Sequence, residues 1–405
     1  MTAPSALAAL FGGRWPEGRW PAGVLAAHGS PARLPEALRS PELASFDTLA
    51  RRYRGPLSFG RGLRDPQTFD SASNAASLFK LGLTVYLRDV VPWVPGAPAL
   101  LRALEHELGV ADGCARLGAF ASPGDDGVSC HYDAEDVISV QLAGTKTFHV
   151  APMAEIEAPY GTQFGPDMVA VDDLFPQARG GFPDASKARF ETVEMAPGSV
   201  LFLPRGTWHR TEAREDSFAV SIVLRPPSAL DTLHQALQSL LLASPDWRAP
   251  IRGLRQPGPA RDAERRRLDG LLHGLPALLG ALSADDLATD SLDERLARLT
   301  PASTFLRVPT SSLDLEPSGA GRVRLTLRAW DQDWVARDTV RTEVPAEVAP
   351  AARWVADRPR AFSLADLASA FPALPAPARV QLLQGLVRGH FVRLLGPALP
   401  DPSSP

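Results

Sequence analysis

The residues with the clearest chemical potential in this sequence are His131, Asp133 and His209. His131 and Asp133 are separated by one residue, and on a β-strand residues i and i+2 point to the same face. One strand could therefore present both side chains to a metal ion, with His209 closing the site from a neighbouring strand. Two imidazoles and one carboxylate on one side of a metal leave other coordination positions open, which is the ligand set of non-haem Fe(II) oxygenases.

The segment before His209 supports this interpretation, because a His-x-Asp pair alone is a weak signal. Residues 196–209 read Ala-Pro-Gly-Ser-Val-Leu-Phe-Leu-Pro-Arg-Gly-Thr-Trp-His. A Pro-Gly turn enters a short apolar strand and a Pro-x-Gly turn leaves it, which places His209 at a strand edge. Because side chains alternate along a strand, Tyr132 is expected to face away from the metal.

The composition limits the class of protein. A chain of 405 residues is too long for one ordinary core, so two or three domains are expected. Hydrophobic residues make up 45% of the chain, which is ample for globular cores, and the formal net charge is −4. This mild negative charge argues against a chain that mainly neutralises nucleic-acid phosphates.

Cysteine content and the N-terminal sequence indicate the compartment. The two cysteines, Cys114 and Cys130, are too few for a disulfide framework and are expected to be reduced thiols. The N-terminus has no basic region followed by a long apolar core, so no signal peptide is expected. No apolar run approaches the ~18 residues that a membrane span requires. We therefore expect a cytoplasmic protein that does not cross a membrane.

Short strands separated by Gly, Pro and Asp turns fill the region from Ala115 to Leu224 and predict a sandwich or barrel. The expected strands are residues 117–121, 136–142, 146–150, 190–195, 199–203 and 218–224. Ala143-Gly144-Thr145 joins the second of these strands to the third, which is typical of a hairpin. The polar insertion Glu155–Pro183 has a length that is usually functional or disordered inside a β-domain.

Helical patterns flank this region. Residues 1–75 are expected to be irregular with short helices, and Ser228-x-x-Asp231 resembles a helix capping motif. The other elements expected outside the β-region are a strand over 78–87, helices over 99–108 and 261–272, strands over 304–308 and 321–327, helices from Ser363 and over 376–387, and a strand over 391–395.

Three segments carry a family resemblance: His131-Tyr132-Asp133, the run Asp136–Lys146, and Pro204-Arg205-Gly206-Thr207-Trp208-His209. They resemble the Jumonji-C branch of the cupin oxygenases, most closely the bacterial ribosomal-oxygenase-like proteins. The resemblance implies a mostly β core with α additions, namely a double-stranded β-helix followed by a helical dimerisation region and a winged helix. The expected parts are a lead-in over 1–75, the oxygenase domain over 76–226, the dimerisation region over 227–300, the winged helix over 301–397 and a disordered tail over 398–405.

The resemblance also implies Fe(II) and 2-oxoglutarate as cofactors. Three protein ligands leave three octahedral positions, two for the 2-oxo acid and one for O2, and the protein then positions the target. Lys146 is the expected partner of the far carboxylate of 2-oxoglutarate. Relatives often carry an Asn and a Tyr on the strand before His-x-Asp, where this chain has Leu117 and Ala119.

Other hydroxyl groups could replace the missing Asn and Tyr as cosubstrate contacts. The candidates are Thr145, Ser221, Thr147 and Ser139, and the sequence leaves the choice among them open.

Two hypotheses of different class follow. The first is an Fe(II)- and 2-oxoglutarate-dependent oxygenase, in the resembled family a homodimer, that hydroxylates a side chain of a protein or peptide. Its substrate would be a ribosomal protein or the precursor peptide of a natural product. The second is a non-catalytic cupin that binds a metal or small acid and acts as a sensor or interaction module. The complete three-ligand set with open coordination favours the enzyme.

Overall fold

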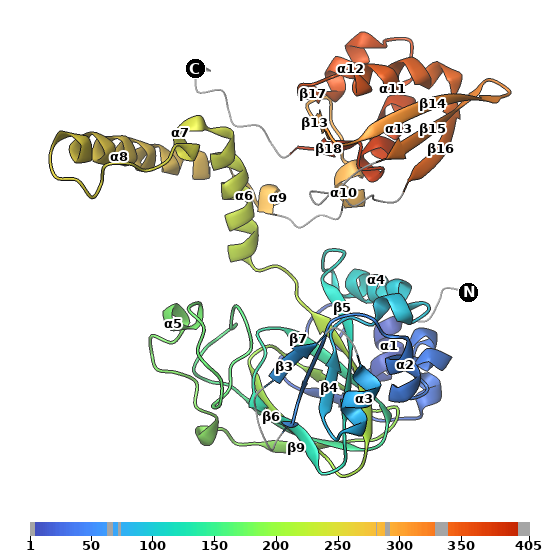
Figure 1. The fold of residues 1–405 in the computed structure, drawn as a ribbon, viewed down its shortest axis with the longest axis vertical. Helices are drawn as coiled ribbons and strands as arrows, with labels where there is room; N and C mark the ends of the chain where they lie inside the picture. The colour runs from blue at the N-terminus through green and yellow to red at the C-terminus, as the bar shows by residue number, and fades with distance from the viewer. Residues whose placement is uncertain are drawn as a thin grey trace. The chain divides into compact units, whose positions relative to one another are not determined.

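Two compact units make up the chain (Figure 1). The structure, a computed structural model, describes residues 5–62, 68–71, 74–280, 282–287, 292–328 and 339–395. The first unit is Met1–Pro227 and the second is Ser228–Pro405. Residues 1–75 therefore belong to the same compact unit as the β-region, and the tail expected to be disordered lies outside the described residues.

An eight-stranded sheet is the larger layer of the first unit. Along the sheet the strands are β1 (Leu25–Ala27), β10 (Val200–Leu203), β7 (Asp136–Ala143), β12 (Ser217–Leu224), β5 (Ala115–Ser122), β4 (Thr84–Leu87), β2 (Leu57–Gly60) and β3 (Thr68–Ser71). All the pairings are antiparallel. The lead-in is thus less irregular than the sequence suggested, because it contributes β1, β2 and β3 to this sheet.

A four-stranded antiparallel sheet is the second layer. Its strands in order are β6 (Asp126–His131), β11 (Thr207–Ala213), β8 (Lys146–Pro152) and β9 (Glu191–Met195). Apolar side chains of both sheets meet in one buried cluster, in which Phe148 and Val150 of β8 pack with Leu201 and Leu203 of β10. The two layers therefore enclose an interior between them.

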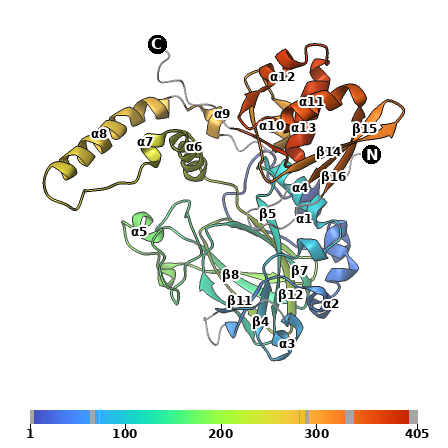
Figure 2. The same ribbon diagram turned by 45° about the horizontal axis from the view of Figure 1, so that its top comes forward.

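Helices cover the outer face of the larger sheet (Figure 2). They are α1 (Ala6–Phe11), α2 (Phe46–Arg52), α3 (Ala75–Lys80) and α4 (Ala97–Leu108), with 3-10 turns at Pro31–Arg33, Glu36–Arg39, Pro41–Leu43 and Val91–Trp93. Their buried faces form one core with alternate residues of the sheet, including Leu117, Ala119, Val220 and Ile222. By alternation, the residues between these face the interior.

The hairpin expected at 143–145 is wrong. β7 pairs with β10 and β12 in the larger sheet, whereas β8 pairs with β11 and β9 in the smaller one. Gly144 has a φ of 63°, and a Cβ there would collide with the carbonyl oxygen of Asp216. The segment is a corner that carries the chain from one sheet to the other, which sequence pattern does not distinguish from a hairpin turn.

The strand expected over 78–87 is correct only in its second half. Residues Ala75–Lys80 form α3, Gly82 turns the chain with a φ of 78°, and β4 begins at Thr84. Phe79 packs on Phe46 of α2 with ring centroids 5.0 Å apart, so the apolar run serves a helix and a strand in succession. Short apolar runs are ambiguous between these two structures.

The insertion between β8 and β9 lies on the outer face of the smaller sheet (Figure 2). It contains α5 (Leu174–Gln177) and a 3-10 turn at Ala185–Lys187. Its Phe164, Ala188 and neighbouring residues pack with Trp208 and Tyr132 in a separate buried cluster.

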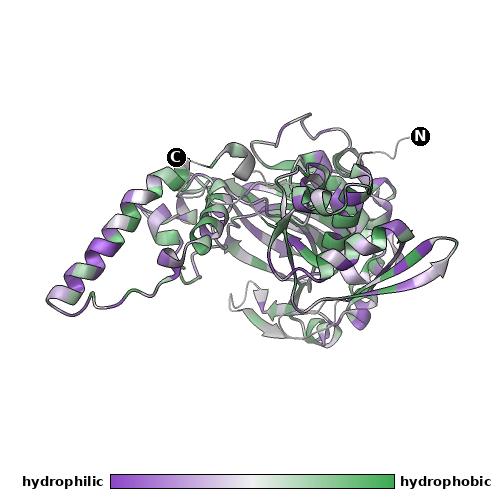
Figure 3. Ribbon diagram, turned by 90° about the horizontal axis from the view of Figure 1, so that it is seen from above, coloured by the Kyte–Doolittle hydropathy of each residue, from purple (hydrophilic) through white to green (hydrophobic). Residues whose placement is uncertain are grey.

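The second unit begins with helices α6 (Ala229–Ala243), α7 (Pro245–Arg248), α8 (Pro259–Gly280), α9 (Ala284–Leu287) and α10 (Leu292–Ala297). The predicted capping box is present, since Ser228 accepts from the Asp231 amide and Asp231 accepts from the Ser228 amide. Hydrophilic residues are concentrated in the first half of α8 and hydrophobic residues in its second half (Figure 3). Among the described residues, no helix is both long enough and apolar enough to cross a bilayer.

The remainder of the second unit has two three-stranded sheets and three helices around one core. The sheets are β17 (Phe362–Ser363), β13 (Thr304–Arg307), β18 (Val392–Leu394) and, separately, β14 (Ser312–Gly319), β15 (Arg322–Arg328), β16 (Val340–Pro345). A 3-10 turn (Ala346–Val348) precedes α11 (Ala349–Ala356), and α12 (Leu364–Ala370) and α13 (Ala376–Arg388) follow. The sequence missed β14, β16 and α11.

Candidate metal centre

Three predicted ligands, His131, Asp133 and His209, converge at one end of the interior. Their possible ligand atoms all lie within 4.8 Å of one another. His131 ends β6 and lies opposite His209 of the neighbouring β11, with a β-bulge in the pairing between His209 and Thr211. Asp133 lies just beyond the strand, but Tyr132 still forms a β-bridge to Phe164, so the chain stays extended and the expected alternation holds.

Hydrogen bonds fix which nitrogen each imidazole offers. His131 Nδ1 lies 2.8 Å from the carbonyl oxygen of Ser129, and His209 Nδ1 lies 3.0 Å from that of Thr207. A carbonyl only accepts, so both Nδ1 atoms carry the proton and both Nε2 atoms keep a free lone pair. Such a bond from the distal nitrogen is the usual support of a metal-binding histidine.

The distances suit a shared ion. His131 Nε2 is 3.8 Å from one oxygen of Asp133, and His209 Nε2 is 3.7 Å from the other. A single ion at roughly 2.1 Å from each ligand atom can bridge pairs separated by up to about twice that distance. The two nitrogens and one carboxylate therefore fit a divalent transition metal, with the remaining coordination positions open.

The protonation state of His209 also suits metal binding. Burial, together with the nearby His131, lowers the pKa of His209 to about 4. The imidazole is therefore neutral at pH 7 and does not have to release a proton before it coordinates.

A second set of contacts locks the two ligand segments together. Arg205 donates through its backbone amide to one oxygen of Asp136 and through its guanidinium to the other, at 2.9–3.1 Å. The amide of Gly206, whose φ is 75°, donates to the carbonyl of Asp133 at 2.8 Å. The Pro-x-Gly turn before His209 is thus tied to the loop that carries Asp133.

Farther inside, between the two sheets, buried polar side chains follow the metal centre. Lys146 faces inward from β8 and is 3% exposed, with its Nζ 3.2 Å from Ser122 Oγ of the opposite sheet. Burial lowers the pKa of Lys146 to about 8, against an opposing attraction from Asp126. Thr84 donates to Asp126 at 3.1 Å, so this acid and lysine bridge the two sheets.

The strand before His131 does not place Leu117 and Ala119 in the interior, which corrects the expected position of the cosubstrate contacts. Both side chains are buried under the helices. The inward positions of β5 are instead Gly118, Phe120 and Ser122. The expected positions therefore lie on the opposite face of this strand, because a shift of one residue exchanges the faces.

A residue that the sequence did not single out, Tyr86, lies on this inward face. It pairs with Phe120 in the sheet, and the two rings stack at 4.2 Å. A Cβ at Gly118 would lie 2.7 Å from the Tyr86 hydroxyl, so the absence of a side chain there admits the phenol. Burial raises the pKa of Tyr86 to about 12, and Asp133 is among the charges that act on it. In the sequence, only Gly118 indicated this arrangement, because a glycine on the inward face leaves space for a side chain from another strand.

The other candidate cosubstrate contacts differ in whether their side chains face the interior. Ser221 is buried and pairs with Gly118 and Ser139, on the inward face. Thr145 is not brought to the interior, because it is exposed at the corner and donates to Glu215. Thr147 faces outward and donates to Glu194.

Two other residues of these segments are held within the fold. Gln141 is fully buried and donates to Ser217, while Trp208 packs on Tyr132.

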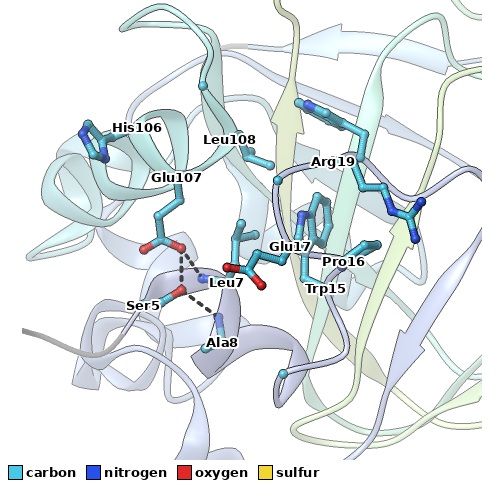
Figure 4. A pocket seen from close by; sticks show the side chains of 14 residues that line it. Ser5, Leu7, Ala8, Trp15, Pro16, Glu17, Arg19, His106, Glu107 and Leu108 are labelled. Carbon is cyan, nitrogen blue, oxygen red and sulfur yellow. Dashed lines mark hydrogen bonds between the residues drawn. The ribbon is translucent and has the colours of Figure 1, made fainter.

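A cavity of about 500 Å³ lies apart from these ligands, between α1, the end of α4 and the loop that carries Trp15 (Figure 4). Its Glu107 accepts hydrogen bonds from Ser5 and from the backbone amides of Ala6 and Leu7. That carboxylate therefore serves the start of α1, and the cavity contains none of the predicted site residues.

Segments of this chain are similar in sequence to known proteins. A family model described as the JmjC domain matches residues 110–232. The uncharacterized protein YxbC of Bacillus subtilis is 24% identical over 241 residues, covering 56% of this chain and 72% of that protein. Lysine-specific demethylase 8 of Xenopus tropicalis is 30% identical over 107 residues, covering 26% of this chain and 24% of that protein.

Solved structures of the Escherichia coli ribosomal oxygenase YcfD are also similar. The complex with cobalt and succinic acid has 16% identity and a TM-score of 0.41, covering 91% of this chain and 94% of that one. The complex with cobalt and 2-oxoglutarate has 18% identity and a TM-score of 0.39, covering 87% and 90%. The match of residues 110–232, which include all three predicted ligands, shows that this segment is similar to the JmjC domain.

Proposed function

We propose that this protein is an Fe(II)- and 2-oxoglutarate-dependent oxygenase that hydroxylates an amino-acid side chain of a protein or peptide. The observation that carries the proposal is the convergence of His131, Asp133 and His209, with both Nε2 lone pairs free and directed at one carboxylate. The match of this segment to the JmjC domain supports it. The donor set is that of Fe(II) sites with open positions.

The residues of the interior suit a five-carbon diacid. Val150 pairs with His209, and Lys146 lies four residues back on β8, roughly 13 Å away along the strand. A ligand held at the metal by its 2-oxo acid group would extend toward Lys146, whose ammonium would bind its far carboxylate. Ser122, which Lys146 already contacts, and the inward hydroxyls of Tyr86 and Ser221 would complete the contacts.

The chemistry of hydroxylation would come from the iron and the cosubstrate, which together supply an oxidant for an unactivated C–H bond. The protein supplies placement. Arg205 and Asp136 hold the two ligand segments in register, and burial of the imidazoles keeps water from competing. Asp133 is the most exposed of the three ligands, its side chain 23% accessible against 9% for each histidine, so the open side of the centre lies there.

The finer assignments belong to this proposal as well. The substrate is a ribosomal protein or the precursor peptide of a natural product, and the helices after Pro227 pair two copies into a dimer. Leu230 and Leu242 of α6 are each 58% exposed, which supports an apolar contact of that helical segment.

The test is anaerobic loading with Fe(II), followed by O2-dependent succinate production from 2-oxoglutarate with and without a cell peptide extract. We expect stoichiometric iron binding and succinate formation stimulated by the extract, both lost in His209→Ala. A folded protein that binds no iron would refute the proposal. Binding of iron and 2-oxoglutarate without any succinate would instead indicate a non-catalytic cupin that senses a metal or small acid.

A further inference from the structure

The insertion between β8 and β9, residues 153–190, borders the metal centre. Tyr132, between the two predicted ligands, exchanges two backbone hydrogen bonds with Phe164, at 2.9 and 3.1 Å. The next residue, Gly165, lies so close that a Cβ there would meet the Cys130 carbonyl and, at 3.2 Å, the Cβ of His131. The backbone of the insertion is therefore in contact with the segment that presents the ligands.

This insertion is anchored. Ile156, Leu174 and Ala185 are buried, and Phe164 packs in the cluster that includes Trp208. Gln177 of α5 accepts from the Tyr160 amide and donates to the Tyr160 carbonyl, which joins the two parts of the insertion. The insertion is thus held in place by its packing against the smaller sheet and by this side-chain link.

Aromatic side chains nevertheless remain in water on this anchored segment. Phe175 is 55% exposed and Phe182 is 46% exposed; we call these two residues the aromatic patch. Phe175 and Phe182 meet edge to face at 5.5 Å, and Phe182 lies 6.3 Å from Phe164. An aromatic series therefore leads from Tyr132, on the outer face behind the ligand segment, to the surface. Exposed apolar groups gathered in one place are typical of a binding surface.

The charge of the insertion is complementary to a cationic partner. Residues 153–190 contain six acidic and three basic residues. Among the described residues, no ion pair involves Asp172 or Asp173, both exposed and directly before α5, whereas the cation Lys187 is already paired with Asp184 at 3.2 Å. Acidic groups beside an apolar patch favour a partner that carries Arg or Lys next to an apolar side chain.

We propose that the aromatic patch is the docking site of the substrate polypeptide, and that it binds a basic peptide segment through one apolar or aromatic side chain flanked by arginines or lysines. The proposal rests on the proposed function, whose substrate class it specifies. An extended peptide anchored on Phe175 and Phe182 would follow the insertion toward Phe164 and bring a later residue to the open side of the metal centre.

The first test is peptide binding by fluorescence anisotropy. The probe is a fluorescein-labelled peptide of twelve residues with four arginines around one phenylalanine, added to the full chain. We expect the double variant Phe175→Ala/Phe182→Ala to bind it about tenfold or more weakly, as hot-spot aromatics do. Phe69→Ala is the matched control, because Phe69 is 54% exposed on β3 and also contacts another phenylalanine. Equal weakening by the control, or no weakening by the double variant, overturns the proposal.

The second test separates charge from apolar contact. Asp172→Asn/Asp173→Asn should weaken binding several-fold at low salt and have little effect at high salt, because exposed charges are screened. A probe with glutamates in place of its arginines should not bind. If it binds as tightly as the basic probe, the assigned partner chemistry is wrong.

Other occupants of the patch have their own outcomes. If sedimentation shows that Phe175→Ala/Phe182→Ala converts a dimer to a monomer, the patch is a contact between copies and the proposal fails. Iron binding, 2-oxoglutarate binding and succinate formation without peptide are measured on the same samples. Their absence with intact peptide binding refutes the proposed function alone, and their presence without peptide binding refutes the docking site alone.

Discussion

Replacing Lys146 with methionine tests the cosubstrate site most directly. Lys146 is 3% exposed and contacts Ser122 across the interior, so its ammonium has little access to water and few competing partners. Methionine keeps most of the volume and removes the charge. We expect 2-oxoglutarate to bind much more weakly, while the Fe(II) affinity changes little, because Lys146 is not among the three convergent metal ligands.

The magnitude follows from the burial. Truncating one partner of a buried charged hydrogen-bonded pair costs about 2–5 kcal/mol. Asp126 already attracts the ammonium, which lowers the net gain from a second carboxylate. A loss of about 3 kcal/mol corresponds to a roughly 100-fold higher dissociation constant for 2-oxoglutarate.

Calorimetric titration of 2-oxoglutarate into the Fe(II)-loaded protein without O2 measures this change. Lys80→Met is the matched control, since Lys80 is an exposed lysine at the end of α3. A dissociation constant for Lys146→Met within about twofold of the unsubstituted protein would refute the reasoning, because this loss would be far below ~1 kcal/mol.

The pH dependence of 2-oxoglutarate affinity tests the role of Lys146 independently. Burial lowers the pKa of Lys146 from 10.5 to about 8, so the ammonium that attracts a carboxylate is present below pH 8 and lost above it. We expect the affinity for 2-oxoglutarate to fall about tenfold per pH unit above 8. Lys146→Arg stays charged over this range and should remove the dependence. The unfolded chain binds the extra proton up to pH 10.5, so Lys146 makes the protein more stable as pH rises from 8 to 10.5.

Four further outcomes are expected. Asp133→Ala should abolish detectable Fe(II) binding in an equilibrium dialysis assay, since two imidazoles alone leave the ion without its charged ligand. Arg205→Met should lower the free energy of unfolding by about 2 kcal/mol in urea denaturation, because it leaves the largely buried Asp136 without its charged partner. Tyr86→Phe should raise the KM for 2-oxoglutarate several-fold without lowering thermal stability, since only the hydroxyl is removed. Ser228→Ala should cost about 1 kcal/mol of stability through loss of the capping box, with no effect on iron binding.

The metal centre could be predicted from the sequence because its geometry is local. His131 and Asp133 share a face through the period of an extended chain, and the turn residues around His209 mark where the neighbouring strand begins. The capping boxes at Ser228 and Ser363 were predictable for the same reason, since each involves residues three apart.

Sheet membership was not predictable in this way. β7 and β8 are adjacent in sequence and read as a hairpin, yet they belong to different sheets. Which strands pair is decided by burial over the whole unit, and a short turn with one glycine serves a hairpin and a corner equally well. Strands β1, β2 and β3 were missed because each has only three or four residues, too few to show a pattern in the sequence.

The absence of the expected Asn and Tyr also depends on sheet arrangement, which the sequence pattern does not reveal. The resemblance places the expected Asn and Tyr at Leu117 and Ala119, whose side chains face the helices. On the inward face Gly118 has no side chain, and Tyr86 from the adjacent β4 occupies the space above it. The inward face therefore has a buried hydroxyl group that comes from another strand. If this interpretation is right, Gly118→Val should displace Tyr86 and weaken 2-oxoglutarate binding as Tyr86→Phe does, and the two substitutions together should cost little more than one alone, because coupled residues are not additive.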